Sequence, residues 1–301
     1  MARYQHGIFA EGTGIHHHLE ASLKPGTTAS ELSAALGKVR ASNVEQRTNG
    51  GTNLVIGLGP NALELLKLEA IEPFPGYSSP GDVHVAPSTQ RDVWVWVHGN
   101  STDLVIDVAR QVHSALSTVC VVDLDLGGFV YHDSRDMTGF IDGTANPFPD
   151  DAPREAVVGD DSPSAGSSLA VTLRFTHALK QFAELSVPEQ QNVIGRAKPD
   201  SAKLESKPAD SHIARAEVAD ESGEELMVYR RSVPWATAGE QGLMFVSFGA
   251  DTLRHDMQMR QMYGMVDDAI VDRLLDFTTP DTGSFWRCPS VEDLDLVAPL
   301  G

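Results

Sequence analysis

The chain has 301 residues, of which 41% are hydrophobic, a composition typical of a globular protein with one large domain or two smaller ones. Its formal net charge of −19 argues against binding to nucleic acid or anionic membranes, because phosphate contacts need a basic face. No segment approaches the roughly 18 apolar residues of a membrane span, and the N-terminal residues lack the apolar core of a secretory signal. The two cysteines, Cys120 and Cys288, form no disulfide framework, so we expect a reducing, cytoplasmic location, with Cys120 as a buried thiol.

The first half of the chain alternates strand and helix patterns. Thr28 is a suitable N-cap for a first helix, and the spacing of Leu104, Val108, Val112 and Leu116 gives a later helix one apolar face. The patterns predict strands over 15–23, 52–59, 92–99 and 119–133, and helices over 28–42, 61–70 and 101–117.

The second half repeats this order, which favours a weak internal duplication and an α+β architecture of two sheets, each with helices on one face. Two such sheets could face each other and leave a cavity between them. A segment rich in Pro, Asp, Ser and Gly, 148–168, is the predicted linker, and it divides the chain into domains 1–150 and 151–301. The patterns predict a strand and a helix within 166–185, a long loop over 195–212, a strand over 224–235, a strand and a helix within 241–262, and a helix over 266–278.

The stretch GFIDGTANP, residues 139–147, places the carboxylate of Asp142 between two glycines. Gly139 and Gly143 allow backbone angles that other residues avoid and a close approach to a neighbouring group. Such a segment is most often a turn with an exposed Asp, but it also suits a carboxylate held at the edge of a ligand cavity. The residues of this stretch alone do not decide between the two.

Histidines and arginines supply the other candidate site residues. His16, His17 and His18 would point alternately to the two faces of a strand, so at most two could converge on a metal ion, and no other ligand pattern accompanies them. His212 ends the long loop and precedes Arg230 by 18 residues. Arg230 and its neighbour Arg231 lie in an otherwise apolar strand, so one of them should point inward, where a cation needs an anionic partner.

Six segments together carry a family resemblance. They are GFIDGTANP, IGRAKPDS, SHIARAEV, MVYRRSVPW, GLMFVSFGAD and VDRLLDFTTPDTGSFWRCPS, and they occur in the order seen in dye-decolourising peroxidases. The chain resembles the bacterial B-type branch over nearly its whole length. This resemblance implies two ferredoxin-like domains of the dimeric α+β barrel superfamily, with most of the pocket for haem b in the C-terminal one.

The resemblance also implies roles at the haem. His212 matches the axial ligand of the haem iron, while Asp142 and Arg230 match the carboxylate and the arginine on the opposite, distal side. Arg196 resembles a basic residue that meets a haem propionate, and Ser232 stands where some members carry Asn.

A carboxylate that binds the axial imidazole is also expected from the resemblance. Asp272 is the candidate for this position. Asp268 and Asp276 lie nearby in the sequence and remain alternatives.

The function implied is reduction of hydrogen peroxide to water with oxidation of dyes, phenols or other small organic donors through a ferryl intermediate. Asp142 would move the peroxide proton and Arg230 would oppose the developing negative charge. Alternatives are release of iron from haem, as in a deferrochelatase, and carriage of haem. Carriage needs no distal acid or base, so the Asp142 and Arg230 pair counts against it. The resemblance further implies a homo-oligomer, whereas the net charge and the lack of a long apolar segment argue against nucleic acid and membranes as partners.

Overall fold

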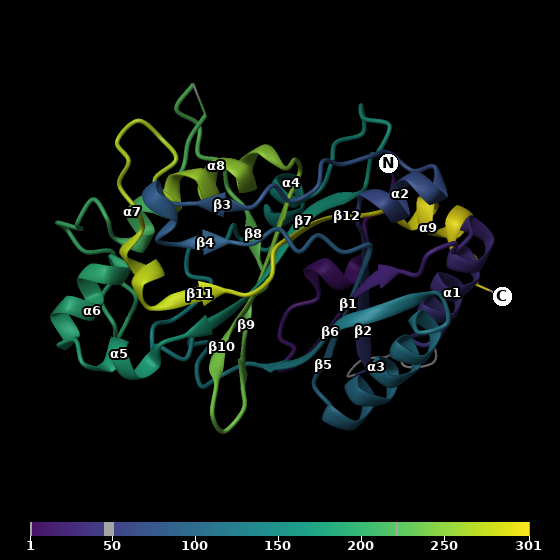
Figure 1. Cartoon of the computed structure of the whole chain (residues 1–301), viewed down its shortest axis with the longest axis horizontal. Helices are drawn as coiled ribbons and strands as arrows, with labels where there is room; N and C mark the ends of the chain where they lie inside the picture. The colour runs from purple at the N-terminus through teal and green to yellow at the C-terminus, as the bar shows by residue number, and fades with distance from the viewer. Residues whose placement is uncertain (1, 45–50, 221, 301) are drawn as a thin grey trace.

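The computed structural model describes residues 2–44, 51–220 and 222–300, and these form an α+β fold around one antiparallel sheet (Figure 1). Its strands run in the order β6-β1-β5-β2-β12-β7-β10-β8, with β9 beside β10 and β11 beside β7. The strands are β1 (Ile15–Leu23), β2 (Thr52–Leu58), β5 (Val93–Gly99), β6 (Cys120–Phe129), β7 (Ser168–His177), β8 (Tyr229–Arg230), β9 (Val233–Ala236), β10 (Gln241–Gly249), β11 (Thr278–Pro280) and β12 (Ser284–Cys288); β3 (Tyr77–Ser78) and β4 (Val85–Ala86) pair separately.

The helices gather in two groups at opposite ends of the sheet. α1, α3 and α9 lie beside the strands of the first half, and α5, α6, α7 and α8 lie beside those of the second half (Figure 1). Their bounds are α1 (Ala29–Ala41), α2 (Pro60–Leu66), α3 (Thr102–Leu116), α4 (Ala152–Ala156), α5 (Leu179–Ala183), α6 (Val187–Ile194), α7 (His212–Ala216), α8 (Leu253–Met262) and α9 (Val291–Val297), with 3-10 turns η1 (His6–Phe9), η2 (Pro80–Asp82) and η3 (Arg273–Asp276).

The last strand, β12, joins the two halves of the sheet. It pairs with β7 over its whole length and meets β2 through Arg287 opposite Leu58. The C-terminal helix α9 then returns to the first half, where Arg40 of α1 donates hydrogen bonds to the carbonyls of Leu294 and Ala298. The division of the chain at residue 150 stays a prediction.

The space between the two halves of the sheet is filled, contrary to the expectation of a cavity there. Trp94 and Trp96 of β5 pack against Phe248 of β10 and Trp286 of β12, and all four side chains are buried. Because successive residues of a strand face opposite sides, the odd-numbered residues of β7 and β10 point away from this aromatic core. A large cavity instead lies on that outer face, between the sheet and the helices of the second half.

Two predicted elements differ from the structure, and one observed helix lacks a prediction. The helix expected over 266–278 is only the 3-10 turn η3, because the side chain of Asp272 caps it at the backbone N–H of Leu274 and left-handed backbone at Ala269 precedes it. The strand expected over 224–235 is reduced to β8 and β9. The helix α6 was not predicted, although Ser186 and Glu189 form a capping box at its start.

The linker predicted over 148–168 contains α4, whose Ala152 and Ala156 pack into the aromatic core between the two halves. Small apolar side chains on a short helix explain this, since they let the segment lie close against the sheet. The segment therefore connects the halves and also belongs to their shared core.

The three neighbouring histidines of β1 alternate as predicted. His16 and His18 are buried on the inner face, and His17 points outward to bind Asp125 at 2.6 Å. Within residues 2–44, 51–220 and 222–300, no three His, Cys, Asp or Glu side chains gather in a way that could hold a metal ion. Cys120 and Cys288 are both free and buried, as expected for Cys120.

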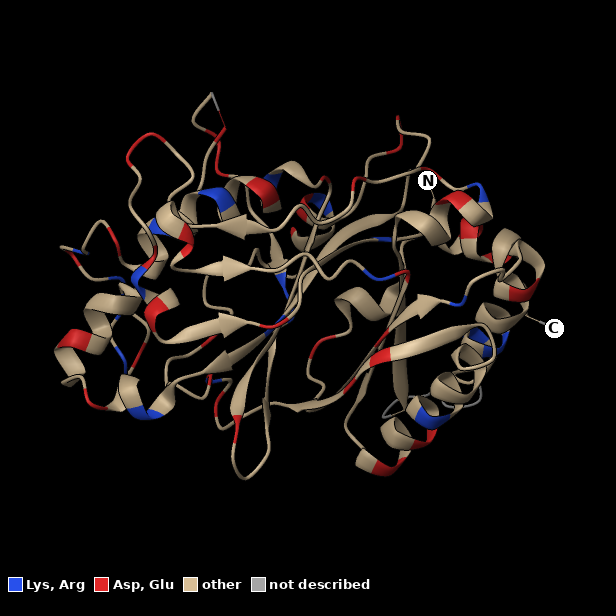
Figure 2. Ribbon diagram, in the orientation of Figure 1, with Lys and Arg blue, Asp and Glu red and all other residues tan. Residues whose placement is uncertain are grey.

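Acidic residues are distributed over both halves of the molecule, in keeping with its net charge (Figure 2). None of the helices that the structure describes is long and apolar enough to cross a membrane.

Candidate active site

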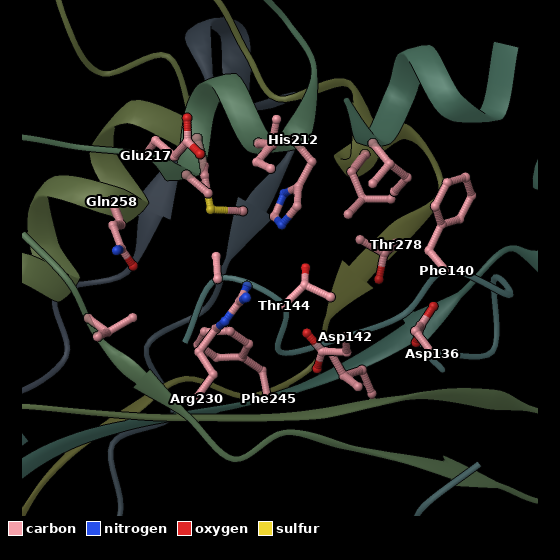
Figure 3. A pocket seen from close by; sticks show the side chains of 18 of the residues that line it. Asp136, Phe140, Asp142, Thr144, His212, Glu217, Arg230, Phe245, Gln258 and Thr278 are labelled. Atoms are coloured by element: carbon pink, nitrogen blue, oxygen red, sulfur yellow. The ribbon is translucent and has the colours of Figure 1, made fainter. Parts of the chain in front are cut away.

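The cavity lies between the outer face of β7 and β10 and the helices α6, α7 and α8, and it encloses about 1470 Å³ when its opening to solvent is included. Its walls are largely apolar. Polar groups enter from two opposite sides, with His212 on one side and Arg230 and Asp142 on the other (Figure 3). The apolar wall residues include Leu173 and Phe175 of β7, Leu243 and Phe245 of β10, and Met259 and Met262 of α8.

His212 is the first residue of α7, and its ring extends into the cavity (Figure 3). The preceding residue, Ser211, is buried and binds the carbonyl of Pro208 through its hydroxyl, which fixes the turn into the helix. The Nδ1 atom of His212 donates a hydrogen bond to Oδ2 of Asp272 at 2.7 Å. With its proton on Nδ1, the neutral imidazole keeps the lone pair of Nε2 for a ligand in the cavity.

The structure distinguishes Asp272 from the two neighbouring candidates. Its side chain is fully buried, and its second oxygen, Oδ1, accepts from the backbone N–H of Leu274. Asp268 instead binds Arg215 at 2.8 Å, and Asp276 lies 3.2 Å from His84. The predicted contact between a carboxylate and His212 is therefore made by Asp272.

The turn around Asp142 has the backbone that its glycines suggest. Gly139 and Gly143 have φ angles of 87° and 77°, in the left-handed region that favours glycine. The N–H of Asp142 binds the carbonyl of Ser134, and the N–H of Gly143 donates to Oδ1 of Asp142 at 2.7 Å. These bonds leave Oδ2 of Asp142 for the cavity.

Arg230 ends the short edge strand β8 and lines the cavity near Asp142 (Figure 3). The next residue, Arg231, points to the other face of the sheet, as strand alternation predicts. Its guanidinium donates to the carbonyls of Ile8 and Ala10 and lies 5.0 Å from the ring centre of Trp96. Arg230 is thus the arginine of this pair that faces the cavity.

A second carboxylate and a second histidine lie on the same side of the cavity as Asp142. Asp136 accepts a 2.9 Å bond from Nε2 of His177, and its other oxygen accepts from the hydroxyl and N–H of Thr138. Burial opposes ionisation of Asp136, but the bonds from His177 and Thr138 outweigh it and hold the pKa of the carboxyl below its usual value.

Of the two remaining predicted site residues, one lines the cavity and the other is not among the described lining residues. Arg196 lines the cavity and donates to the carbonyl of Ser201, and burial lowers the pKa of its guanidinium. The described lining does not include Ser232, whose hydroxyl is 3.4 Å from the carbonyl oxygen and 3.2 Å from the backbone nitrogen of Val246. The structure thus brings Arg196 to the cavity and places Ser232 against β10.

Two sequence family models together match almost the whole chain. A sequence model described as the N-terminal part of Dyp-type peroxidases matches residues 5–130, and one for the C-terminal part matches residues 133–293. The chain belongs to the Dyp-type peroxidase family. The C-terminal match spans the cavity residues described above, from Asp136 to Asp272.

Similar proteins come from species of Rhodococcus and Mycobacterium. A dye-decolorizing peroxidase of Rhodococcus erythropolis is 34% identical over 254 residues, which cover 82% of this chain and 74% of that protein. A variant of DypB from Rhodococcus jostii, solved in complex with heme, matches with a TM-score of 0.89 and 28% identity over 97% of both chains. The encapsulated DyP-type peroxidase of Mycobacterium smegmatis matches with a TM-score of 0.92 and 28% identity over 100% of both chains.

Several cavity residues were not predicted as site residues from the sequence. Asp136 and His177 come from distant segments, and no spacing in the sequence links them. Asn146 is not part of the described lining, but it binds the backbone of Arg230 beside the cavity. It lies within the stretch GFIDGTANP and was interpreted only as a residue that ends the turn; its place in the same short stretch as Asp142 is a signal that could have marked it.

Proposed function

We propose that this protein binds haem b through His212 and uses Arg230 and Asp142 to reduce hydrogen peroxide to water. Membership of the Dyp-type family makes the chain a haem-dependent peroxidase, and haem b is its cofactor. The observation that carries the residue assignment is the cavity itself, in which an imidazole faces an arginine and a carboxylate across apolar walls (Figure 3).

The residues of the cavity fit a haem group. Apolar walls from β7, β10 and α8 suit the porphyrin, and Arg196 supplies a cation for a propionate. His212 offers Nε2 to the iron, and the carboxylate of Asp272 on Nδ1 makes the imidazole a stronger electron donor and fixes its orientation. When bound, haem supplies the iron that holds peroxide and the electrons that break its O–O bond.

The distal residues handle the proton and the charge. Oδ2 of Asp142 is the oxygen left to hold a proton, and it would accept one from bound peroxide and return it to the oxygen that leaves as water. Arg230 stays positively charged and donates hydrogen bonds toward the departing oxygen, where negative charge develops. The apolar walls exclude bulk water and strengthen both effects.

Small organic molecules are the proposed electron donors, including dyes and phenols. They return two electrons, one at a time, so that each cycle consumes one peroxide, two electrons and two protons and yields two waters. The resemblance to relatives named dye-decolorizing peroxidases supports this substrate class.

Release of iron from haem would use the same pocket, and the relatives named as peroxidases favour peroxide reduction over it. Carriage of haem is less well supported by this cavity, because it needs no acid–base group together with a fixed cation opposite the ligand imidazole, and Asp142 and Arg230 supply both. A carrier would also be expected to release its haem readily, whereas the buried carboxylate of Asp272 holds the ligand imidazole in one orientation.

We further propose a cytoplasmic homo-oligomer. Two free, buried cysteines suit a reducing compartment. The proposal of assembly rests on the family resemblance alone. Sedimentation at micromolar concentration tests it, and a monomer of 32.4 kDa at every concentration would refute it.

A peroxide-dependent dye assay tests the proposed function most simply. The haem-loaded protein should bleach an anthraquinone dye only when peroxide is present, and Arg230→Leu should lose most of this activity. Recovery of an iron-free porphyrin from the native protein, with no dye oxidation, would instead support iron release.

A further inference from the structure

In the turn that carries Asp142 (residues 139–147, here called the distal turn), the side chain of Asn146 binds the backbone of Arg230. The Nδ2 atom of Asn146 donates to the carbonyl of Arg230 at 2.8 Å, and the N–H of Arg230 donates to Oδ1 of Asn146 at 3.0 Å. The two residues are 84 positions apart in the chain. A single amide group thus satisfies both backbone polar groups of Arg230.

The position of Arg230 in the sheet explains why these groups need a partner. β8 is the last strand on the path of the sheet, and it pairs only through Tyr229 and Arg230 with β10. The next residue, Arg231, already turns its N–H to the carbonyl of Val246. The outward N–H and C=O of Arg230 would be open at this edge, and the amide of Asn146 takes the place of a further strand.

The same asparagine is tied to Asp142. The N–H of Asn146 donates to the carbonyl of Gly143 at 3.0 Å, and Gly143 in turn donates to Oδ1 of Asp142. A continuous chain of hydrogen bonds therefore runs from the carboxylate of Asp142 through the turn to the backbone of Arg230. The turn and the strand come from distant parts of the sequence, and Asn146 is the link between them.

We propose that Asn146 is a positioning residue that sets where the guanidinium of Arg230 lies relative to Asp142. This inference rests on the proposed peroxidase function of the site. Only an amide carries a donor and an acceptor side by side in the arrangement that a backbone N–H and C=O require. Loss of the amide frees the end of β8, so that Arg230 keeps its charge but no longer holds it at the position where an anion binds.

Fluoride binding to the haem-loaded protein measures the position of Arg230 independently of turnover. Fluoride binds ferric haem iron, and hydrogen-bond donors on the distal side stabilise it as they would stabilise a departing oxygen. The dissociation constant of fluoride should be measured by absorption titration for the native protein, Asn146→Ala, Arg230→Leu and the double variant. Asn192→Ala, an exposed asparagine of α6, is the matched control.

We expect Asn146→Ala to weaken fluoride binding about tenfold, because a displacement of the order of 1 Å removes most of the benefit of a placed donor. The double variant should bind fluoride as weakly as Arg230→Leu alone, within about twofold, because Asn146 acts through Arg230. Asn146→Gln, which keeps the amide, should recover part of the loss. The control should bind fluoride as the native protein does.

Two results would overturn the proposal. One is fluoride binding by Asn146→Ala within about twofold of the native value, and the other is a loss that adds in full to that of Arg230→Leu. If Asn146→Ala does not retain haem, Asn146→Ser replaces it in the same cycle, since the shorter serine side chain does not reach the backbone N–H and C=O of Arg230 that the amide binds. Absence of peroxide-dependent dye oxidation in the native protein would refute the proposed function. The fluoride titration would still show whether Asn146 positions Arg230, because it does not depend on turnover.

Discussion

His212 and Asp272 form a 2.7 Å hydrogen bond in which the carboxylate is fully buried and the imidazole borders the cavity. Because Oδ1 of Asp272 is held by the N–H of Leu274, the carboxylate cannot turn away from the ring. The bond therefore fixes both the orientation and the protonated nitrogen of His212, and it connects the short helix α7 to the turn η3.

Replacing this carboxylate by an amide should weaken the axial ligand. In Asp272→Asn the shape is kept but the negative charge is lost, so the imidazole donates less electron density. We expect a rise in the midpoint potential of the haem iron and a loss of roughly 10–100-fold in haem affinity or peroxidase activity. Spectroelectrochemical titration measures the potential.

Asp276→Asn is the matched control for this variant, because Asp276 lies in the same 3-10 turn and its side chain is 51% exposed beside His84. It should leave the potential unchanged. An unchanged potential in Asp272→Asn as well would show that the bond does not tune His212.

Arg230 and Asp142 should contribute unequally to the reaction with peroxide. Arg230→Leu removes a fixed cation and should slow the peroxide-induced change of the haem spectrum by roughly 10²–10³-fold. Asp142→Ala should cost less, because an ordered water in a polar pocket can move the proton in its place. The double variant should show non-additive losses, because both residues act on the same peroxide.

Stopped-flow mixing with peroxide measures these rates. Arg110→Leu, with a side chain 79% exposed on α3, removes the same charge far from the proposed site and serves as control. Near-native rates in Arg230→Leu together with complete loss in Asp142→Ala would reverse the proposed ranking.

A buried carboxylate in the core should make the stability of the protein depend on pH. Burial raises the pKa of Glu20 to about 7, although Thr172 donates a 2.6 Å bond to it. Between its ordinary pKa near 4.5 and this value, the folded protein holds a proton that the unfolded chain has lost, so Glu20 lowers the free energy of unfolding as pH rises through this range.

Glu20→Gln should remove this pH dependence of the free energy of unfolding while keeping an acceptor for Thr172. From pH 5 to pH 8, the native protein should lose roughly 2–3 kcal/mol more stability than the variant. Denaturant unfolding at both pH values measures the difference. Equal pH dependence in the two proteins would show that Glu20 does not titrate in this range.

Acid and salt should both increase oxidation of anionic dyes. The net charge of −19 repels such dyes near neutral pH, and protonation of carboxylates reduces this repulsion, so we expect an acidic optimum. Added salt should raise the rate at neutral pH by screening, with little effect on a neutral phenol. If neither acid nor salt favours the anionic dye over the phenol, surface charge does not govern access.

The sequence predicted most strands and the longer helices of this fold, because their side-chain periods are local. Val108, Val112 and Leu116 of α3 are buried as their spacing predicts. The prediction of a helix around Asp272 was wrong. The Asp272 side chain accepts a hydrogen bond from the backbone N–H of Leu274 and so starts a 3-10 turn, and the spacing of apolar residues does not show such a bond.

The main cavity contacts could be placed from the sequence only through resemblance to a family. Strand alternation indicated that one of Arg230 and Arg231 faces inward, but it did not select Arg230. The links from Asn146 to Arg230 and from Asp136 to His177 join segments far apart in the chain, so no local pattern contains them. The location of the cavity on the outer face of β7 and β10 likewise depends on how the two halves pack.

Loss of the axial ligand tests the central claim most directly. His212→Gly should purify without the Soret band of the native haem-loaded protein, and millimolar imidazole should restore haem binding by filling the space of the missing ring. His132→Gly, an exposed histidine ahead of the distal turn, should bind haem as the native protein does. Native haem content and an unchanged axial-ligand spectrum in His212→Gly without imidazole would contradict the assignment of His212 to the haem iron.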